Sequence, residues 1–188
     1  MSEIKVRQIV LASRLQGKVQ LNNFRLEEDA SRGPGPGEVL LKTKYLSLDP
    51  YMRGRMDDRK SYAEPTTLGS VMPGESIATV IESRNPEYKV GDIVTAFTGW
   101  RTHAVSDGTK LRMVDSTLAP ITTALGVLGM PGFTAYAGLK VIGKPAIGET
   151  VVVAAASGPV GSLVGQLAKI AGARSRDRRR SNEVRVCT

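Results

Sequence analysis

An apolar run followed at once by a turn of small residues constrains the fold of this chain more than any other segment. Residues 150–156 read Thr-Val-Val-Val-Ala-Ala-Ala and are apolar on both faces, which is typical of a strand buried in a parallel sheet. The turn Ser157-Gly158-Pro159-Val160-Gly161 comes next. The helix predicted after it carries one apolar stripe, formed by Val160, Val164, Leu167 and Ala171. A strand, a small-residue turn and a helix open a dinucleotide-binding βαβ unit.

The turn has the composition that a pyrophosphate site needs. Glycine lets backbone N–H groups approach the phosphates, and the N-terminus of the following helix adds a partial positive charge. Ala156 stands at the first of the three glycine positions of the fingerprint. We predict cofactor binding by Ser157, Gly158, Pro159, Val160 and Gly161, with a tight turn that binds nothing as the alternative. The residue that selects the cofactor is expected about 20 residues further on, where we recognise no second strand.

The first 125 residues predict a different architecture, in which short strands alternate with tight turns. The strands are expected at 4–14, 38–48, 76–82 and 93–97. Asp49 is placed as the N-cap of a short helix and Pro50 as its first residue. A compact barrel-like domain is the natural interpretation.

Four segments carry further motifs. They are Leu46–Arg53 (Leu-Ser-Leu-Asp-Pro-Tyr-Met-Arg), Gly99-Trp100, Gly126–Tyr136 (Gly-Val-Leu-Gly-Met-Pro-Gly-Phe-Thr-Ala-Tyr), and Val152–Gly165. In this order, over residues 8–174, they resemble the zinc-independent branch of the medium-chain dehydrogenase/reductase superfamily, which contains prostaglandin, alkenal and curcumin reductases. The resemblance implies an α+β chain, in which a β-rich, GroES-like barrel domain precedes the first βα unit of a truncated Rossmann domain. It also implies NADP(H) as cofactor and, as in many members, homodimers.

The domain organisation expected from these features has three parts. Residues 1–125 form the GroES-like N-terminal domain, residues 126–174 begin the dinucleotide-binding domain, and residues 175–188 form a basic tail outside the family pattern. The charged N-terminus and the short apolar runs predict neither a signal peptide nor a membrane span. A single cysteine excludes an internal disulfide, so a reducing, cytoplasmic setting is expected.

No metal site is predicted, because a catalytic zinc needs three protein ligands around an open position. The one histidine is His103 and the one cysteine is Cys187, in the tail. Where zinc-dependent relatives carry cysteine and Gly-His-Glu, this chain has Asp49 and Gly74-Glu75-Ser76. We expect His103 to be a structural residue at a strand end.

Without a Lewis acid, hydride transfer to a simple carbonyl loses its main electrophilic catalyst. A conjugated enone or enal is easier to reduce, because hydride adds to the β-carbon and the enolate oxygen needs only hydrogen-bond donors. We therefore expect NADP(H)-dependent reduction of the C=C bond of a small enone or enal. A protonated tyrosine hydroxyl suits the donor role.

The resemblance assigns the donor role to Tyr51, with Tyr62 as a second candidate; packing at a strand end and a surface position are the respective alternatives. Met130 and Thr134 match positions that line the nicotinamide, although Thr134 also suits a helix start. Trp100 suits either a substrate cleft or core packing. The arginines of Arg53-Gly54-Arg55 are expected to be solvated.

The tail departs from the family pattern, which requires an apolar second strand and then a glycine pair. Of the net charge of +8, residues 174–188 contribute +4, from six arginines against Asp177 and Glu183. Shifting the reading frame by one base turns CGN arginine codons into codons for Val, Ala, Gly, Asp or Glu, and one permitted choice restores the strand and the glycine pair. A frameshifted, truncated product is therefore our hypothesis, and a genuine basic tail that binds nucleic acid or an acidic partner is the alternative.

Aromatic residues for stacking on bases are absent from the tail, which argues against nucleic acid. No segment after residue 174 reads as a buried strand, so strand 151–156 is expected to lack parallel neighbours on at least one side. An inactive fragment or a non-catalytic binding module is the alternative function. Weak NADPH binding and self-association through the exposed strand edge are then expected.

Overall fold

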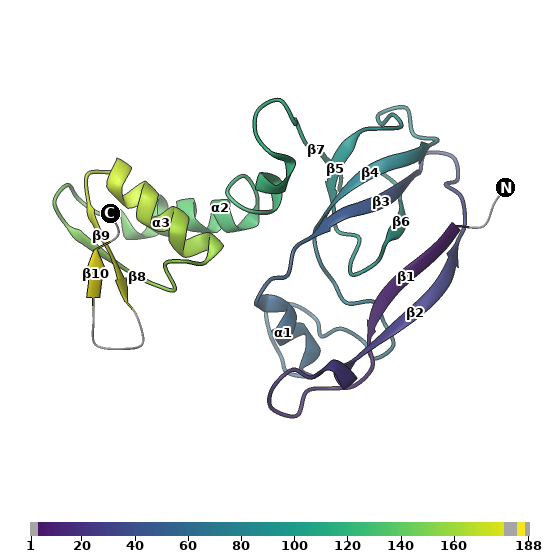
Figure 1. The fold of residues 1–188 in the computed structure, drawn as a ribbon, viewed down its shortest axis with the longest axis horizontal. Helices are drawn as coiled ribbons and strands as arrows, with labels where there is room; N and C mark the ends of the chain where they lie inside the picture. Colours follow the sequence, from purple (N-terminus) through teal and green to yellow (C-terminus); the bar gives the residue numbers. More distant parts are fainter. Residues whose placement is uncertain (1–3, 179–183, 187–188) are drawn as a thin grey trace. The chain divides into compact units, whose positions relative to one another are not determined.

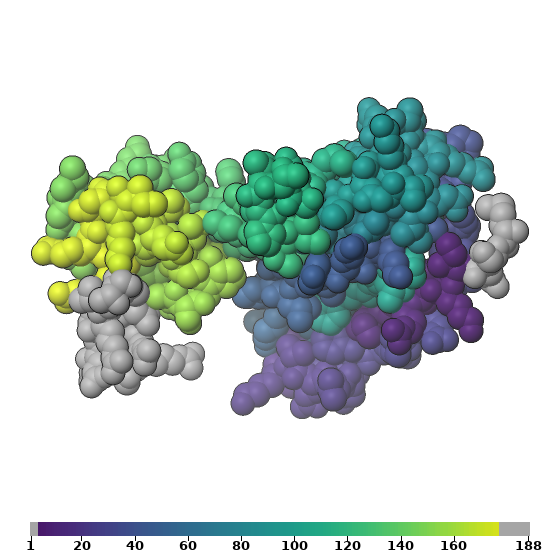
Figure 2. Space-filling model, turned by 45° about the horizontal axis from the view of Figure 1, so that its top comes forward, coloured from purple at the N-terminus to yellow at the C-terminus, as the bar shows by residue number. Residues whose placement is uncertain are grey.

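The computed structural model describes residues 4–178 and 184–186 (Figure 1 and Figure 2), and the chain divides into two compact units, Met1–Ile121 and Thr122–Thr188. The first unit is built mainly from antiparallel strands. The second contains helices and a small sheet that includes one parallel pair.

The first unit contains a two-stranded ribbon and a five-stranded sheet. In the ribbon, β1 (Ile4–Leu11) pairs along its whole length with β2 (Phe24–Ser31), which follows the short helix η1 (Leu21–Asn23). The sheet has the order β6-β3-β4-β5-β7, and all its pairs are antiparallel. Its strands are β3 (Val39–Leu46), β4 (Ser76–Ser83), β5 (Ile93–Ala96), β6 (His103–Ser106) and β7 (Arg112–Met113).

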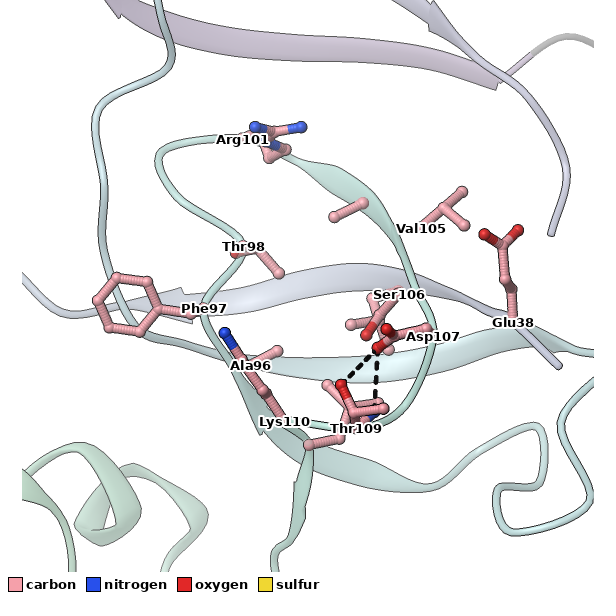
Figure 3. A pocket seen from close by; sticks show the side chains of 13 residues that line it. Glu38, Ala96, Phe97, Thr98, Arg101, Val105, Ser106, Asp107, Thr109 and Lys110 are labelled. Atoms are coloured by element: carbon pink, nitrogen blue, oxygen red, sulfur yellow. Dashed lines mark hydrogen bonds between the residues drawn. The ribbon is translucent and has the colours of Figure 1, made fainter. Parts of the chain in front are cut away.

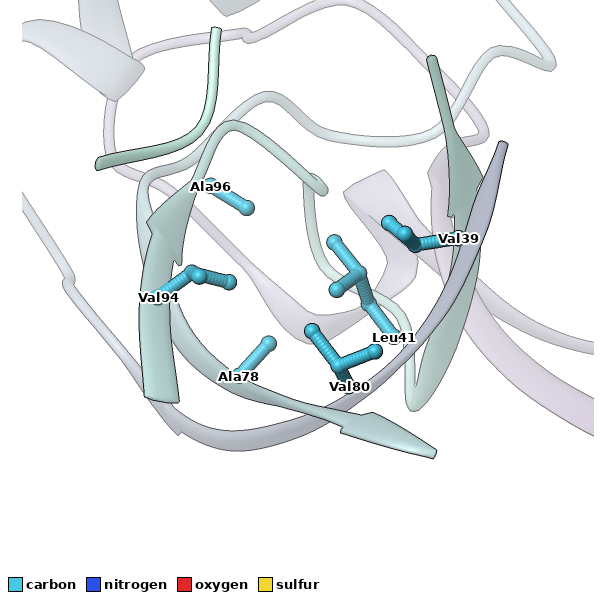
Figure 4. Packing of buried hydrophobic residues seen from close by; sticks show 6 residues of the cluster. All are labelled: Val39, Leu41, Ala78, Val80, Val94 and Ala96. Carbon is cyan, nitrogen blue, oxygen red and sulfur yellow. The ribbon is translucent and has the colours of Figure 1, made fainter. Parts of the chain in front are cut away.

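The core of this unit lies on the inner face of the five-stranded sheet. Alternate residues of three neighbouring strands point to the same side, because successive side chains of a strand face opposite ways. Figure 4 shows the strands curving around these six buried side chains, which are Val39, Leu41, Ala78, Val80, Val94 and Ala96. The curved sheet agrees with the barrel-like domain that the short strands and tight turns of the sequence predicted.

A second cluster lies beside the helix α1 (Tyr51–Met56) and consists of Leu11, Met52, Met56 and Met72. The helix begins one residue later than predicted. Pro50, not Asp49, is its N-cap, and no side chain caps it. Asp49 contributes its backbone carbonyl instead, which accepts a hydrogen bond from the N–H of Met52 at 3.0 Å.

The second unit begins with η2 (Ile121–Leu125), which starts at the boundary, and α2 (Met130–Tyr136), which continues into the π-helical turn η3 (Ala137–Gly143). After β8 (Thr150–Ala154) comes α3 (Pro159–Ile170), and then β9 (Arg174–Arg178) and β10 (Val184–Val186). The sheet order is β10-β9-β8, with β8 and β9 parallel. Its buried core is Leu139, Ala168 and Ala173.

The strand β9 corrects the prediction that no second strand follows residue 174. Val151 of β8 lies in register with Ser175, and Val152 with Arg176. The alternating sequence explains why a strand forms here: Ser175 is buried while Arg174 and Arg176 are exposed, so one face of β9 is covered and the other is open. The residues of the tail outside 174–178 and 184–186 lie beyond those that the structure describes.

The strand β8 was predicted to be buried on both faces, but it is covered on one. Val153 is 7% exposed, whereas Val152 is 55% exposed. Among the described residues β8 pairs only with β9, so its other edge is open, as expected. The described part of the chain therefore lacks the second helical layer that parallel sheets normally have.

Candidate functional site

Tyr51 is the first residue of α1 and is half-buried, not a strand-end residue. Its side chain packs against the cluster of Leu11, Met52, Met56 and Met72. One helical turn later, the guanidinium carbon of Arg55 lies 5.9 Å from the centroid of the Tyr51 ring. This distance is within the range of a cation–π contact. No described residue forms a hydrogen bond with the Tyr51 hydroxyl, so that group is free to donate to a ligand.

Two carboxyl groups share the surroundings of Tyr51. Burial raises the pKa of the Tyr51 phenol, and the negative charge of Asp49 raises it further, with Glu75 acting in the same direction. Arg55 opposes this effect, because a cation favours the phenolate. Burial also raises the pKa of Glu75, Asp49 adds to that increase, and Arg112 and a hydrogen bond from Thr95 oppose it.

The structure brings Tyr62 into this electrostatic neighbourhood but does not bury it. Tyr62 is 84% exposed. It raises the pKa of the Tyr51 phenol, but it is the smallest of the causes that do so. Tyr51 is thus the better placed of the two tyrosines to act in a water-poor site.

The expectation of solvated arginines is wrong for Arg55. Its Nη1 donates to the carbonyl of Glu64 at 3.0 Å, and its Nε is buried without a hydrogen-bond partner. Arg53 is exposed, as expected, although its Nη2 donates to the carbonyl of Gly17 at 2.9 Å. Sequence reasoning missed Glu75 as a neighbour of Tyr51. The available signal was the position of Glu75 in the segment Gly74-Glu75-Ser76, where zinc-dependent relatives carry a metal ligand.

Trp100 packs in the core of the first unit, and it also borders a cavity. Its ring stacks on Phe24 with centroids 5.4 Å apart, and it packs against the methionine cluster. It also lines a cavity of about 360 Å³ beside α1, together with Leu48, Pro50 and Met52. The motif loop before Tyr51 therefore forms one wall of an apolar cavity within the first unit.

A larger cavity of about 500 Å³ lies beside β5 and β6 (Figure 3). Both of its acidic side chains are already engaged. Asp107 accepts hydrogen bonds from the N–H and hydroxyl of Thr109 at 3.0 and 2.9 Å. Glu38 is held by Arg32, which lowers the pKa of Glu38 to about 2. Because no predicted site residue lines this cavity, we do not assign it to the candidate site.

His103 is the first residue of β6 and is partly buried. Its Nδ1 lies 3.1 Å from the hydroxyl of Thr102, and burial lowers its pKa, with Lys42 adding to the effect. Within residues 4–178 and 184–186, no group of three or more histidine, cysteine, aspartate or glutamate side chains is arranged to hold a metal ion. In the same residues, no helix is both long and apolar enough to cross a membrane.

In the second unit, the turn between β8 and α3 holds all five predicted phosphate-binding residues. Gly158 is the N-cap of α3, and Pro159, Val160 and Gly161 form its first turn after Ser157. The N–H of Gly158 donates to the carbonyl of Ala155 at 3.0 Å. No described backbone group accepts a hydrogen bond from the N–H of Val160 or Gly161. These two donors point out of a twelve-residue helix whose N-terminus attracts anions.

Close packing explains why Gly161 must be glycine. A Cβ atom there would lie 2.4 Å from the carbonyl oxygen of Ala155, closer than any real contact. Gly165 similarly allows β9 to approach, because its Cβ would lie 3.1 Å from the Ser175 hydroxyl. At these two glycines α3 lies close to the backbone that leaves β8 and to β9.

Met130 and Thr134 both lie on α2 and are exposed. The Thr134 hydroxyl donates to the carbonyl of Met130 at 2.8 Å, so its lone pairs remain free to accept a hydrogen bond. The start of α2 packs so tightly that a Cβ at Gly132 would lie 1.8 Å from the carbonyl oxygen of Val127. The predicted residues therefore form two groups, one around Tyr51 in the first unit and one on α2 and α3 in the second.

Comparison with known proteins identifies the lineage. The model of the N-terminal domain of oxidoreductase matches residues 7–114. The NADPH-dependent curcumin reductase of Escherichia coli K12 is 53% identical over 168 residues, which are 89% of this chain and 49% of that protein. The NADP⁺-dependent 2-alkenal reductase of Nicotiana tabacum is 38% identical over 175 residues, covering 90% and 51% of the two chains.

Solved structures agree. The chain is 50% identical to CurA of Vibrio vulnificus in its complex with NADPH, with a TM-score of 0.87, over 91% of this chain and 51% of that one. The chain thus spans about half the length of the relatives that it matches. It belongs to the oxidoreductase family that this N-terminal domain defines, in the branch of the medium-chain dehydrogenase/reductase superfamily that contains the curcumin, prostaglandin and alkenal reductases.

Proposed function

We propose that this chain carries the substrate half and the first phosphate-binding turn of an NADPH-dependent reductase that acts on the C=C bond of α,β-unsaturated aldehydes and ketones. The observation that carries the proposal is Tyr51, a half-buried phenol at the start of α1 whose hydroxyl has no hydrogen-bond partner among the described residues. Such a phenol is a hydrogen-bond donor suited to an oxygen that becomes negatively charged.

The turn between β8 and α3 fits the pyrophosphate of a dinucleotide. The free N–H groups of Val160 and Gly161 are donors, and Gly158 presents no side chain that would block the approach. We assign residues 157–161 to the pyrophosphate, and Met130 and Thr134 to the nicotinamide end. The free lone pairs of Thr134 suit the N–H groups of a carboxamide. Bound NADPH would supply the hydride.

The residues of the first unit suit a conjugated carbonyl. When the β-carbon of an enal gains a hydride, negative charge moves to the carbonyl oxygen. The Tyr51 hydroxyl would donate to that oxygen, and the apolar cavity beside α1 would accept the hydrocarbon part of the substrate. The raised pKa of Tyr51 keeps its proton in place at neutral pH.

The proposal includes two further points. We expect a cytoplasmic location, because a single cysteine excludes an internal disulfide and fits a reducing setting. We also expect self-association, because homodimers are common in the family that the chain resembles. Small enals and enones are the substrates, and neither a membrane nor a nucleic acid takes part.

Turnover by the purified chain tests the proposal. NADPH and trans-2-nonenal are mixed with the protein, the loss of NADPH is followed by its absorbance, and the product is identified by gas chromatography. We expect nonanal as the product, and no NADPH consumption with nonanal as substrate. Formation of the allylic alcohol, or oxidation of NADPH by nonanal, would contradict C=C reduction.

A non-catalytic role is the second candidate, and the open face of β8 and β9 favours it. Val152 is exposed on that face, and the hydroxyl of Ser175 is buried without a hydrogen-bond partner. An unpartnered buried hydroxyl costs about 1–3 kcal/mol, which leaves the second unit less stable than a complete sheet would be. If a folded preparation neither binds NADPH in calorimetric titration nor turns over nonenal, this candidate is favoured.

A further inference from the structure

The cavity of about 500 Å³ beside β5 and β6 is a feature of the first unit that the proposed function does not use (Figure 3). Its volume lies within the range of about 300–1,000 Å³ that small-molecule sites occupy. It shares no lining residue with the apolar cavity beside α1. The chemistry of any occupant is therefore set by the walls of this cavity alone.

Arg101 is the cation at one end of the cavity, as Figure 3 shows. The strand β1 holds the backbone on both sides of it. The N–H of Ile9 donates to the carbonyl of Trp100 at 2.8 Å. The N–H of Thr102 donates to the carbonyl of Arg7 at 2.9 Å. The segment that carries Arg101 is thus fixed at the cavity wall by the fold of the first unit.

The guanidinium of Arg101 is partly buried and has no partner in the described part of the chain. Among residues 4–178 and 184–186 it forms no hydrogen bond and no ion pair, and its Nε is buried. Burial lowers the pKa of Arg101, and the charge of Asp29 opposes this effect. Buried charges in proteins are normally paired, because an unpaired one loses its hydration without compensation. An anion in the cavity would supply the missing partner.

The other charges on the cavity walls compensate one another. Figure 3 shows Lys110 and Asp107 in the part of the cavity away from Arg101, and their opposite charges attract each other. Glu38 forms an ion pair with Arg32. Arg101 is therefore the wall cation that lacks a carboxylate in contact with it. A single anionic group on a ligand matches this arrangement.

Apolar side chains of the core form another part of the wall. Leu41 and Ala96 belong to the buried cluster of the five-stranded sheet, and Leu111 packs against that cluster. The hydroxyl of Thr98 is already engaged by the hydroxyl of Ser76 at 2.8 Å. These surfaces suit the hydrocarbon part of a ligand. A carboxylate suits Arg101, because it matches the planar fork of donors that a guanidinium presents.

We propose that the cavity beside β5 and β6 binds a small organic monocarboxylate, with its carboxylate on the Arg101 guanidinium and its hydrocarbon part against Leu41, Ala96 and Leu111. A second carboxylate on the ligand would meet the negative charge of Asp107 and lower the affinity. The site is separate from the residues assigned to reduction, so the inference does not rest on the proposed function.

Hexanoate is the probe for the first test, which uses the full chain and no variant protein except for assignment. Binding is followed by ¹⁵N NMR through the Nε–H signal of Arg101, which Arg101→Gln identifies by its loss. We expect hexanoate to shift this signal saturably, hexanamide to leave it in place, and adipate to bind more weakly than hexanoate. The inference is overturned if hexanoate does not bind, if uncharged hexanamide binds equally well, or if adipate binds at least as tightly.

The second test compares variants through the backbone N–H signals of the cavity wall. We expect Arg101→Gln to weaken hexanoate binding by roughly tenfold or more, because charge-assisted hydrogen bonds are lost. Arg25→Gln is the matched control, since Arg25 is exposed on β2 and paired with Glu27, and it should bind hexanoate as the wild type does. Leu111→Ala should weaken the binding of hexanoate more than that of acetate.

Two outcomes of the variant test would contradict the site. One is an affinity of folded Arg101→Gln for hexanoate equal to that of the wild type. The other is an equal loss of affinity in Arg25→Gln, which would indicate a general effect of charge. If Arg101→Gln does not fold, the comparison of hexanoate with hexanamide in the wild type and the Leu111→Ala result decide.

Discussion

A Cβ atom at Gly161 would lie 2.4 Å from the carbonyl oxygen of Ala155 and 2.9 Å from the Cα of Ala156. The first turn of α3 is therefore in direct contact with the backbone that leaves β8. This contact keeps the free N–H groups of the helix next to the end of the strand, where a phosphate would bind.

Gly161→Ala should destabilise the second unit. The added methyl group meets backbone atoms that cannot rotate away, so we expect a loss of about 1–3 kcal/mol in the free energy of unfolding, as in other overpacked sites. Gly138→Ala is the matched control, because nothing lies within 4 Å of its Cβ position. Urea denaturation measures both variants. Equal stabilities for the two would contradict the close approach.

The backbone of the same turn is strained at Ala155, which has a φ of +56°. A residue with a side chain pays about 1–2 kcal/mol in the left-handed region, whereas glycine does not. We expect Ala155→Gly to be neutral or slightly stabilising, because relief of strain offsets the entropy that glycine loses on folding. Ala156→Gly, which has no such strain to relieve, should be destabilising by about 0.5–1 kcal/mol. A larger loss in Ala155→Gly than in Ala156→Gly would refute the strain.

Elements that local sequence pattern determines were predicted correctly, whereas elements that depend on pairing with distant segments were not. The strands β3, β4 and β5 were predicted from runs of apolar and β-branched residues between turns, and in the structure residues such as Val39 and Leu41 bury one face of the sheet. The strand β2 was missed, since Arg25, Glu27, Glu28 and Asp29 make the segment largely charged and its pairing with β1 defines it.

The second unit shows the opposite error. The apolar run at Val152 predicted a strand buried on both faces. Whether a face is buried depends on which other segments pack against it, and the sequence of the strand alone does not determine this. The arginines of β9 argued against a strand, yet a buried Ser175 between exposed Arg174 and Arg176 satisfies a sheet with one open face. Of the site, Tyr51 came from the motif and Arg55 lies one helical turn further along the same helix, whereas the influence of Glu75 on Tyr51 depends on the tertiary fold.

Tyr51→Phe should lower kcat in nonenal reduction by about 10²-fold, which is typical for the loss of one preorganised donor. The ring remains and continues to pack against Met52 and Met56, so stability and KM should change little. Tyr45→Phe, on the strand β3, is the control. A wild-type kcat in Tyr51→Phe would leave Tyr51 with a packing role only.

Glu38 should titrate well below the ordinary value of a glutamate. The side-chain hydrogen bond from Arg32 is the main cause, the N–H of Gly35 adds to it, and the pKa of Glu38 falls to about 2. Because the folded pKa is lower than the unfolded value, this interaction stabilises the fold above the unfolded pKa, near 4.5, and is lost as pH falls towards 2. NMR titration checks the midpoint, which should rise in Arg32→Gln. An unchanged midpoint would exclude Arg32 as the cause.

The open edge and open face of β8 should make the chain self-associate. Within the described residues β8 pairs only with β9, and Val152 is 55% exposed beside the exposed Arg176 of the neighbouring strand. An unpaired strand edge with an apolar side chain invites pairing with a second strand, and an added lysine on such a strand opposes it. We therefore expect Val152→Lys to lower the average mass measured by light scattering at the same protein concentration. Val141→Lys, on the exposed helical turn η3, controls for the added charge and should have a smaller effect. A wild-type chain that stays monomeric at all concentrations, or an equal response to both lysines, would show that association does not use β8.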